Sequence, residues 1–145
     1  MSEKKIMDII HQRLGDRAHD LLIPPPVFRE MNGEFLDFDL THGILQTRFP
    51  VLEKFLNPYG SMQGGMIAAA VDNTFGPLGM LVAPPNVTRR LEMKYSRPVT
   101  TGLDFITVEA RFIDRQDRWL TFTAEVRDQA GRLLARAKAR HWIIE

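Results

Sequence analysis

An almost entirely apolar stretch in the middle of the chain constrains the fold more than any other feature of the sequence. After Gly64 and Gly65, residues 66–71 read Met-Ile-Ala-Ala-Ala-Val. A helix that is apolar on all sides must be buried within its protein. Gly76 and Pro77 are expected to kink or end this helix, and the pair at 84–85 closes the region.

One carboxylate interrupts this apolar segment. Asp72 follows Val71 directly, and Asn73 lies beside it. Burying a carboxylate without partners costs several kcal/mol, so its presence needs a reason. Two interpretations stay open at this point. Asp72 forms a structural ion pair or hydrogen bond, or it is a general base or nucleophile in a cleft.

The paired glycines at the start of the helix strengthen the second interpretation. They let a ligand approach the backbone closely, and the free N–H groups there suit an oxyanion. Tight packing of the helix against a strand explains them equally well. Gly64 and Asp72 lie roughly 12 Å apart along one helix, so one small carbonyl cannot touch both. If both act on one substrate, the second group comes from another copy of the helix in a two-fold dimer.

The periodicity of the remaining chain predicts one further helix and six strands. Residues 3–22 place apolar side chains at spacings of three and four, which is typical of an amphipathic helix, and three prolines at 24–26 stop it. Residues 34–51 predict a hairpin, and four more strands follow at about 86–97, 103–114, 118–128 and 132–144. Short connections between consecutive strands favour antiparallel neighbours.

Alternation within the strands predicts which side chains face the core. In the hairpin, the apolar sets are Leu36, Phe38 and Leu40 on the first strand, and Leu45, Thr47, Phe49 and Val51 on the second. In the last strand, Ala135, Ala137 and Ala139 oppose Arg136, Lys138 and Arg140.

Composition excludes several classes of function. A net charge of +1 gives no general attraction to nucleic acid or an anionic membrane, and the absence of cysteine excludes thiol chemistry and thiolate zinc sites. Residues 1–22 contain no continuous apolar core of a signal peptide, and no apolar run of 18 residues occurs elsewhere, so a cytoplasmic location is expected. The four histidines, at 11, 19, 42 and 141, are scattered, so no metal site is expected.

The segment Asn57-Pro-Tyr-Gly-Ser-Met-Gln-Gly-Gly-Met-Ile-Ala-Ala-Ala-Val-Asp72 resembles the thioesterase superfamily of hotdog folds, of the phenylacetate-degradation type. The family pattern is Asn, five residues, His-Gly-Gly, and then Asp or Glu along the central helix. Downstream, Thr88 through Pro98 is similar to the family's strand that has Ser or Thr about ten residues before a proline. The resemblance covers most of residues 34–144 and leaves the N-terminal helix outside.

The resemblance implies an α+β hotdog fold, in which a long central helix is wrapped by a curved antiparallel sheet. In this chain an extra N-terminal helix and a Pro-rich connection, residues 1–26, precede a hotdog core at 27–145 within a single domain. The resemblance also implies a homodimer, often a dimer of dimers, that hydrolyses an acyl-CoA to a free acid and CoA without a cofactor.

Carried over by position, the family's site falls on named residues of this chain. Asp72 activates water or attacks the thioester directly. Gly64, with Gly65, donates backbone N–H groups to the developing oxyanion, while Asn57 and Thr88 orient the water or the substrate.

Gln63 departs from the family pattern, because it stands where a histidine is common. Its amide can donate to a thioester carbonyl but cannot carry a proton at neutral pH. Asp72 is then the only predicted acid–base group. The oxyanion site is not removed, and one donor there is worth on the order of 10²–10³ in rate.

Two further groups are weighed as substrate contacts. Arg89, Arg90, Lys94 and Arg97 cluster before Pro98, which favours a solvated edge but also suits the phosphates of CoA. Phe75, like Met80 and Met93, is first a core residue and second a candidate to line an acyl pocket.

Three alternatives compete with the thioesterase interpretation. A hotdog dehydratase or hydratase needs a histidine beside its carboxylate, and no histidine lies between residues 43 and 140. A non-catalytic acyl-CoA-binding or regulatory protein is favoured by Gln63. A cone-shaped isomerase places its long helices before the sheet, whereas this apolar helix interrupts the strands. The acyl group, the choice between dimer and tetramer, and the choice between general-base and anhydride routes stay open.

Overall fold

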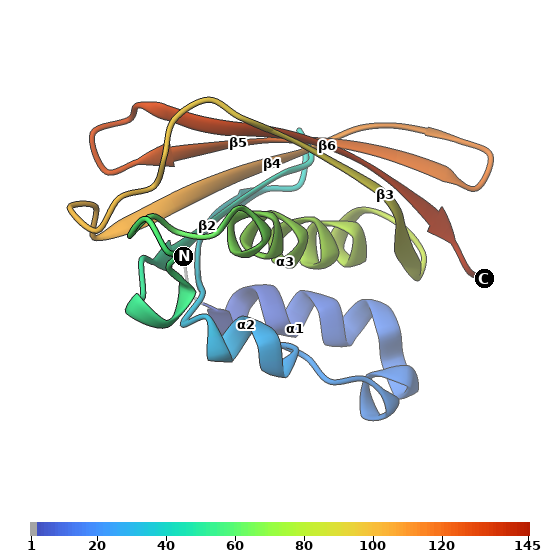
Figure 1. The fold of residues 1–145 in the computed structure, drawn as a ribbon. Helices are drawn as coiled ribbons and strands as arrows, with labels where there is room; N and C mark the ends of the chain where they lie inside the picture. Colours follow the sequence, from blue (N-terminus) through green and yellow to red (C-terminus); the bar gives the residue numbers. More distant parts are fainter. Residues whose placement is uncertain (1–2) are drawn as a thin grey trace.

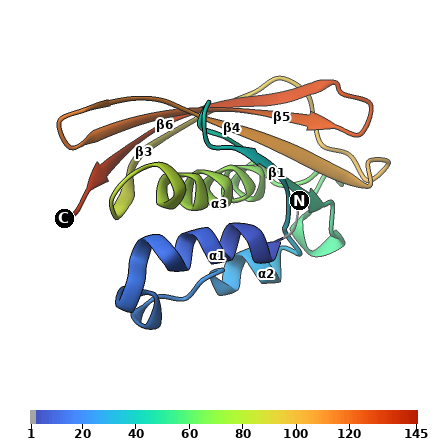
Figure 2. The same ribbon diagram turned by 180° about the vertical axis from the view of Figure 1, so that it is seen from behind.

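A curved six-stranded antiparallel sheet wraps around one long helix in the computed structural model, which describes residues 3–145 (Figure 1). The long helix, α3 (Gly64–Val82), lies against the concave face of the sheet. Helices α1 (Glu3–Leu14) and α2 (Pro26–Glu30) cover the side of α3 that faces away from the sheet (Figure 2). This is the predicted α+β architecture, including the extra N-terminal helix. The proposed division at residue 26 stays a prediction.

Helix α3 is sandwiched between these two layers, which explains its apolar composition. Ala70, Val71 and Phe75 have no exposed surface at all. Of the two outcomes expected at Gly76-Pro77, a kink or an end, the end is wrong, because the helix continues to Val82. A proline inside a helix costs about 3 kcal/mol because it removes a backbone donor. Burial of Pro77 in the core offsets this cost, so packing overrides the local signal.

By length and composition α3 also meets the criterion for a membrane-crossing helix, although the sequence contains no uninterrupted apolar run of that length. An 18-residue stretch of this helix has a mean hydropathy of 1.2, and half of the stretch is buried inside the protein. Core helices of soluble proteins meet the same criterion. The two layers around α3 account for its apolarity without a membrane.

The sheet order places the third strand at an edge. The strands are β1 (Glu34–Asp39), β2 (Ile44–Pro50), β3 (Asn86–Tyr95), β4 (Phe105–Gln116), β5 (Trp119–Asp128) and β6 (Leu133–Ile143), in the order β1-β2-β4-β5-β6-β3. The hairpin β1–β2 and the meander β4–β5–β6 are as predicted. The expectation that β3 neighbours β4 is wrong, because β3 pairs with β6. Helix α3 carries the chain across the sheet, so β2 pairs with β4 instead.

A bulge in β1 changes which side chains reach the core. The register shifts between Phe35 and Asp37, so the predicted alternation of Leu36, Phe38 and Leu40 is wrong. Phe35 is buried and Phe38 packs against the core, whereas Leu40 is exposed. A bulge inserts one residue, so side chains three apart approach the same face. The second strand follows the prediction, with Leu45, Thr47 and Phe49 fully buried.

The N-terminal helix is shorter than residues 3–22. The α-helix ends at Leu14, Gly15 adopts a φ of +59°, and a 3₁₀ helix, η1 (Gly15–Asp20), follows. The sequence did not predict α2 or the short η2 (Glu53–Phe55). Arg13 ties α1 to the end of α3, donating to the carbonyls of Met80 at 2.9 Å and Ala83 at 3.2 Å. Carbonyls at a helix end lack partners within the helix, so these bonds satisfy them.

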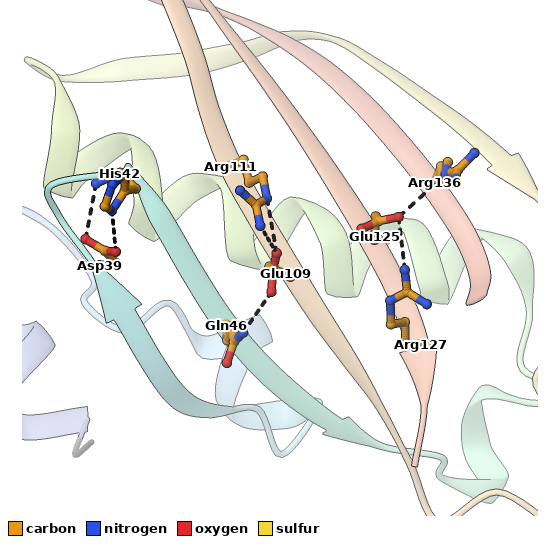
Figure 3. A network of polar contacts seen from close by, with 8 residues as sticks. All are labelled: Asp39, His42, Gln46, Glu109, Arg111, Glu125, Arg127 and Arg136. Carbon is orange, nitrogen blue, oxygen red and sulfur yellow. Dashed lines mark hydrogen bonds and ion pairs between the residues drawn. The ribbon is translucent and has the colours of Figure 1, made fainter. Parts of the chain in front are cut away.

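The outer face of the sheet carries charged side chains that pair with one another (Figure 3). Glu109 accepts hydrogen bonds from Gln46 at 2.8 Å and Arg111 at 2.6 Å. Partial burial opposes ionisation of Glu109, but these two donors bring its pKa below the ordinary value. Arg136 lies 3.6 Å from Glu125, and both Arg136 and Lys138 are exposed, so these basic residues of the last strand lie on the solvated face rather than on the core side.

Candidate active site

A cavity of about 380 Å³ lies beside α3, between the N-terminal segment and the start of β3. Its wall is mostly aliphatic, with Met7 and Ile10 contributed by α1 and Met80 by α3. Four polar residues interrupt this apolar wall, namely Arg13, Asp72, Asn73 and Asn86. Ligand pockets have volumes of roughly 300–1,000 Å³ and are lined mainly by apolar groups with few polar ones. The cavity therefore has the size and the composition of a small-molecule site.

Asp72 makes one hydrogen bond and no ion pair within residues 3–145. The hydroxyl of Thr88, on β3, donates to Oδ1 of Asp72 at 2.9 Å. The second carboxylate oxygen, Oδ2, has no hydrogen-bond partner among the described residues, and the side chain is partly exposed at the cavity wall. Within residues 3–145, Asp72 is therefore not locked in an ion pair. One oxygen is held and the other is available to a ligand or to water.

A buried histidine lies directly behind this pair. Nε2 of His141, on β6, is 3.3 Å from the hydroxyl oxygen of Thr88, and Nδ1 is 2.8 Å from Oδ1 of Asn86. His141 is only 1% exposed. Burial lowers the pKa of His141, and the negative charge of Asp72 partly opposes this shift. The imidazole is therefore held mainly in its neutral form at neutral pH.

The sequence interpretation missed this histidine, which it treated as one of four scattered residues. The alternation of the last strand contained the signal, because Ala135, Ala137 and Ala139 face the core and His141 continues the same series. Thr88 and His141 are also direct cross-strand partners. The argument that no histidine approaches the carboxylate is therefore wrong.

A second group of predicted site residues lies at the start of α3. Gln63 occupies the N-cap position, and its side chain is exposed and makes no hydrogen bond with residues 3–145. The backbone N–H groups of Gly64 and Gly65 also have no partner within the described chain. A Cβ on Gly65 would meet open space. Two adjacent free donors at a helix N-terminus can bind an anion or an oxyanion.

Tyr95, at the end of β3, holds this helix start in place. Its hydroxyl donates to the carbonyl of Gly64 at 2.6 Å, and its ring lies 3.3 Å from where a Cβ of Gly64 would be. Partial burial raises the pKa of Tyr95. The close approach of the ring explains why a small residue is needed at Gly64, and no pattern in the sequence pointed to Tyr95.

Asn57 belongs to the same end of the helix. Its Oδ1 accepts hydrogen bonds from the backbone N–H groups of Tyr59 at 2.9 Å and Ser61 at 3.1 Å. These bonds fix the turn that leads into α3, in which Gly60 has a φ of +80°. Asn57 therefore shapes the approach to Gly64 and has no contact with Asp72.

The candidate residues thus form two groups within one chain. Asp72 lies in the middle of α3 with Thr88 of β3 beside it, whereas Gln63, Gly64 and Gly65 lie at the start of α3, roughly 12 Å away along the helix. No hydrogen bond within residues 3–145 joins the two groups.

The predicted substrate contacts lie outside the cavity wall. Arg90 pairs with Glu92, while Arg89, in a bulge of β3, and Arg97, after the strand, are exposed and form no ion pair within residues 3–145. Phe75 is fully buried against the rings of Phe122 and His141, and it does not line the cavity.

Comparison with known proteins gives a consistent assignment. The family model described as "Thioesterase superfamily" matches residues 59–135. The PaaI protein from the phenylacetic acid degradation operon of Escherichia coli has a TM-score of 0.78 at 16% identity, covering 94% of this chain and 96% of its own.

Two further solved structures extend the comparison. A phenylacetic acid degradation-related protein from Ralstonia eutropha has a TM-score of 0.78 at 25% identity, covering 93% of this chain and 98% of its own. The smu.793 protein from Streptococcus mutans, solved bound to acetyl-CoA, has a TM-score of 0.72 at 20% identity, covering 77% and 88%.

Proposed function

The chain belongs to the thioesterase superfamily, and on that premise we propose that it hydrolyses an acyl-CoA thioester to the free acid and CoA at a site shared between two subunits. One observation carries the proposal. Asp72 lies on the wall of an apolar cavity with one oxygen held by Thr88 and the other without a partner in the described chain.

The open edge of the sheet supports a dimer. Strand β3 is ten residues long and pairs only with β6, and an exposed edge of this length invites pairing with another strand. Asp72 contacts Thr88 near the start of β3, whereas Gly64 contacts Tyr95 at its end. An antiparallel pair of β3 strands would place the start of one opposite the end of the other. Asp72 of one subunit would then face the partner subunit's Gly64.

The reaction follows from this arrangement. Oδ2 of Asp72 takes a proton from water, and the hydroxide adds to the thioester carbonyl. The backbone N–H groups of the partner's Gly64 and the partner's Gly65 stabilise the oxyanion, and the partner's Gln63 adds an amide donor. Collapse of the intermediate breaks the C–S bond, and the departing thiolate takes the proton from Asp72. A direct attack by Asp72 through an anhydride would use the same groups.

The substrate would be recognised through two kinds of contact, apolar contacts to its acyl group and ionic contacts to its phosphates. The apolar cavity suits the acyl group, with α1 and the Pro-rich connection forming much of its wall. Arg89 and Arg97 are free of ion pairs within residues 3–145 and would bind the phosphates of CoA. Acetyl-CoA bound to the Streptococcus mutans protein supports a CoA ester as ligand. A dimer or a dimer of dimers and a cytoplasmic location complete the proposal.

The proposal is tested by thiol release from a panel of acyl-CoA esters, with Asp72→Asn as the variant. The amide cannot accept a proton from water, so kcat should fall by roughly 10²–10⁴-fold while the thermal unfolding temperature stays close to that of the wild type. Binding of CoA esters without hydrolysis by the wild type would instead identify a non-catalytic acyl-CoA-binding protein. Turnover by Asp72→Asn at the wild-type rate would contradict the assignment.

The oxyanion site is tested separately with a matched pair of variants. Gly65→Pro removes the backbone N–H donor and is compatible with the first turn of a helix. Gly65→Ala keeps the N–H donor, and its added Cβ would meet open space. Gly65→Pro should lower kcat by roughly 10²–10³-fold. Gly65→Ala should retain at least about tenfold more activity than Gly65→Pro, because its N–H is intact. Equal activities for the two variants would exclude this donor.

A further inference from the structure

The hydroxyl of Thr88 faces two acceptors but has a single proton. It lies 2.9 Å from Oδ1 of Asp72 and 3.3 Å from Nε2 of His141. A hydroxyl donates one hydrogen bond at a time, although it can accept others. Which of the two acceptors receives this proton depends on the protonation state of each.

Asn86 fixes the ring of His141. The amide Nδ2 of Asn86 donates to the carbonyls of Gly79 at 3.2 Å and Pro84 at 2.8 Å, so its Oδ1 is the atom that faces Nδ1 of His141. A carbonyl oxygen only accepts, so Nδ1 must carry a hydrogen. In the neutral imidazole, Nε2 is then bare and acts as an acceptor toward Thr88.

His141 is sealed from the substrate. Its ring packs against Phe122 on one side, at a centroid distance of 4.7 Å, and against Phe75, at 6.3 Å. The residue does not line the cavity, so it cannot touch a ligand there. Asp72 on α3 is the charged group that acts on it, while β5 and β3 present Phe122, Thr88 and Asn86. Among the described residues, the hydroxyl of Thr88 is the hydrogen-bonded link between His141 and Asp72.

We propose that His141 is a positioning residue for the reaction, because it is the alternative acceptor that lets Thr88 follow the protonation state of Asp72. This inference rests on the proposed thioesterase function. While Asp72 is a carboxylate, Thr88 donates to Oδ1 and leaves Oδ2 to take the proton from water. Once Asp72 is protonated, Thr88 turns its hydrogen to Nε2 of His141. When the leaving thiolate removes the proton from Asp72, Thr88 turns back, and no proton is gained or lost.

The kinetic test uses two substitutions of the histidine. His141→Phe removes the acceptor and suits the aromatic surroundings, while His141→Gln keeps it, because the amide can donate to Asn86 and accept from Thr88. His141→Phe should lower kcat by about tenfold with KM unchanged, and His141→Gln should restore most of the loss. In a Thr88→Val background, His141→Phe should cause no further loss, because the hydroxyl that links them is gone.

Two outcomes would overturn the inference. One is a loss of less than about threefold in kcat for a folded His141→Phe variant, against the tenfold expected. The other is an equal loss in the presence and absence of the Thr88 hydroxyl. The proposed function fails on a different result, which is full activity of Asp72→Asn. Loss of activity in Asp72→Asn together with wild-type kcat in His141→Phe would contradict the positioning role of His141 and leave the proposed function intact.

A measurement on the wild-type protein covers the case in which His141→Phe does not fold. Nitrogen-15 NMR of the histidine rings distinguishes a protonated from a bare nitrogen. The structure requires a hydrogen on Nδ1 of His141 and, at neutral pH, a bare Nε2 that accepts from Thr88. The resonance of Nε2 should shift in Thr88→Val. A ring with its hydrogen on Nε2 alone, or no shift in Thr88→Val, would contradict the proposal.

Discussion

Asp72 and Thr74 leave helix α3 on nearly opposite sides, and their surroundings differ in one decisive respect. Thr74 is fully buried, donates to the carbonyl of Ala70 at 2.9 Å, and lies 2.7 Å from the hydroxyl of Thr47 on β2. Asp72, about 200° away around the helix, borders the cavity and keeps one oxygen without a partner in the described chain.

The difference shows that a polar residue on a buried helix is not in itself a sign of function. At Thr74 each hydroxyl proton is used, since Thr74 donates to Ala70 and Thr47 donates to Thr74. Buried polar groups are normally satisfied in this way. At Asp72, hydrogen-bonding capacity is left over where a ligand can reach it. Spare capacity at a cavity, rather than polarity alone, distinguishes the candidate catalytic residue.

The strongest test of this comparison makes one substitution at each site and measures both the free energy of unfolding and kcat. Thr47→Val removes the donor to Thr74 at nearly constant volume and should lower the free energy of unfolding by about 1–2 kcal/mol. Its kcat should stay within about twofold of the wild type, since the pair is remote from the cavity. Asp72→Asn should show the reverse pattern. Urea unfolding and thiol release measure the two quantities, and loss of activity in Thr47→Val would break the comparison.

A smaller effect is expected in the pH dependence of stability. The folded pKa of His141 lies below the ordinary 6.5 because of burial, although the charge of Asp72 opposes this shift. Between the folded pKa and 6.5 the unfolded chain binds more protons, so stability is lost as pH falls below about 6.5. The contribution is less than about 1.4 kcal/mol per pH unit.

The control for this pH effect is His141→Phe, which has no group to titrate at that position. Measured by urea unfolding, the free energy of unfolding should fall less between pH 8 and pH 5 for the variant than for the wild type. An equal fall in the free energy of unfolding for both proteins would show that burial of His141 does not disfavour its charged form.

The sequence predicted the features that depend on short-range patterns. The buried helix, the hairpin and the β4–β5–β6 meander follow from periodicity and turn residues. Asp72 was singled out as a candidate because a carboxylate contrasts with its apolar neighbours in the chain. Gly64 and Gly65 were singled out because free backbone N–H groups at a helix start can bind an oxyanion.

The remaining features depend on long-range packing. The bulge in β1 and the pairing of β3 with β6 are decided by how α3 crosses the sheet, which no local pattern contains. Continuation of α3 through Pro77 depends on burial rather than on propensity. The inward orientation of the His141 side chain could be predicted from its position in the alternation of β6. Its contact with Thr88 required the strand register.

Subunit complementation tests most directly whether the site is shared between two chains. Asp72→Asn and Gly65→Pro are each expected to be nearly inactive as homodimers. In a heterodimer formed after mixed refolding, one site carries both substitutions and the other carries neither. Random pairing of equal amounts therefore restores about a quarter of the wild-type sites. Activity near that level in the mixture supports the shared site, whereas a mixture no more active than its two components would contradict it.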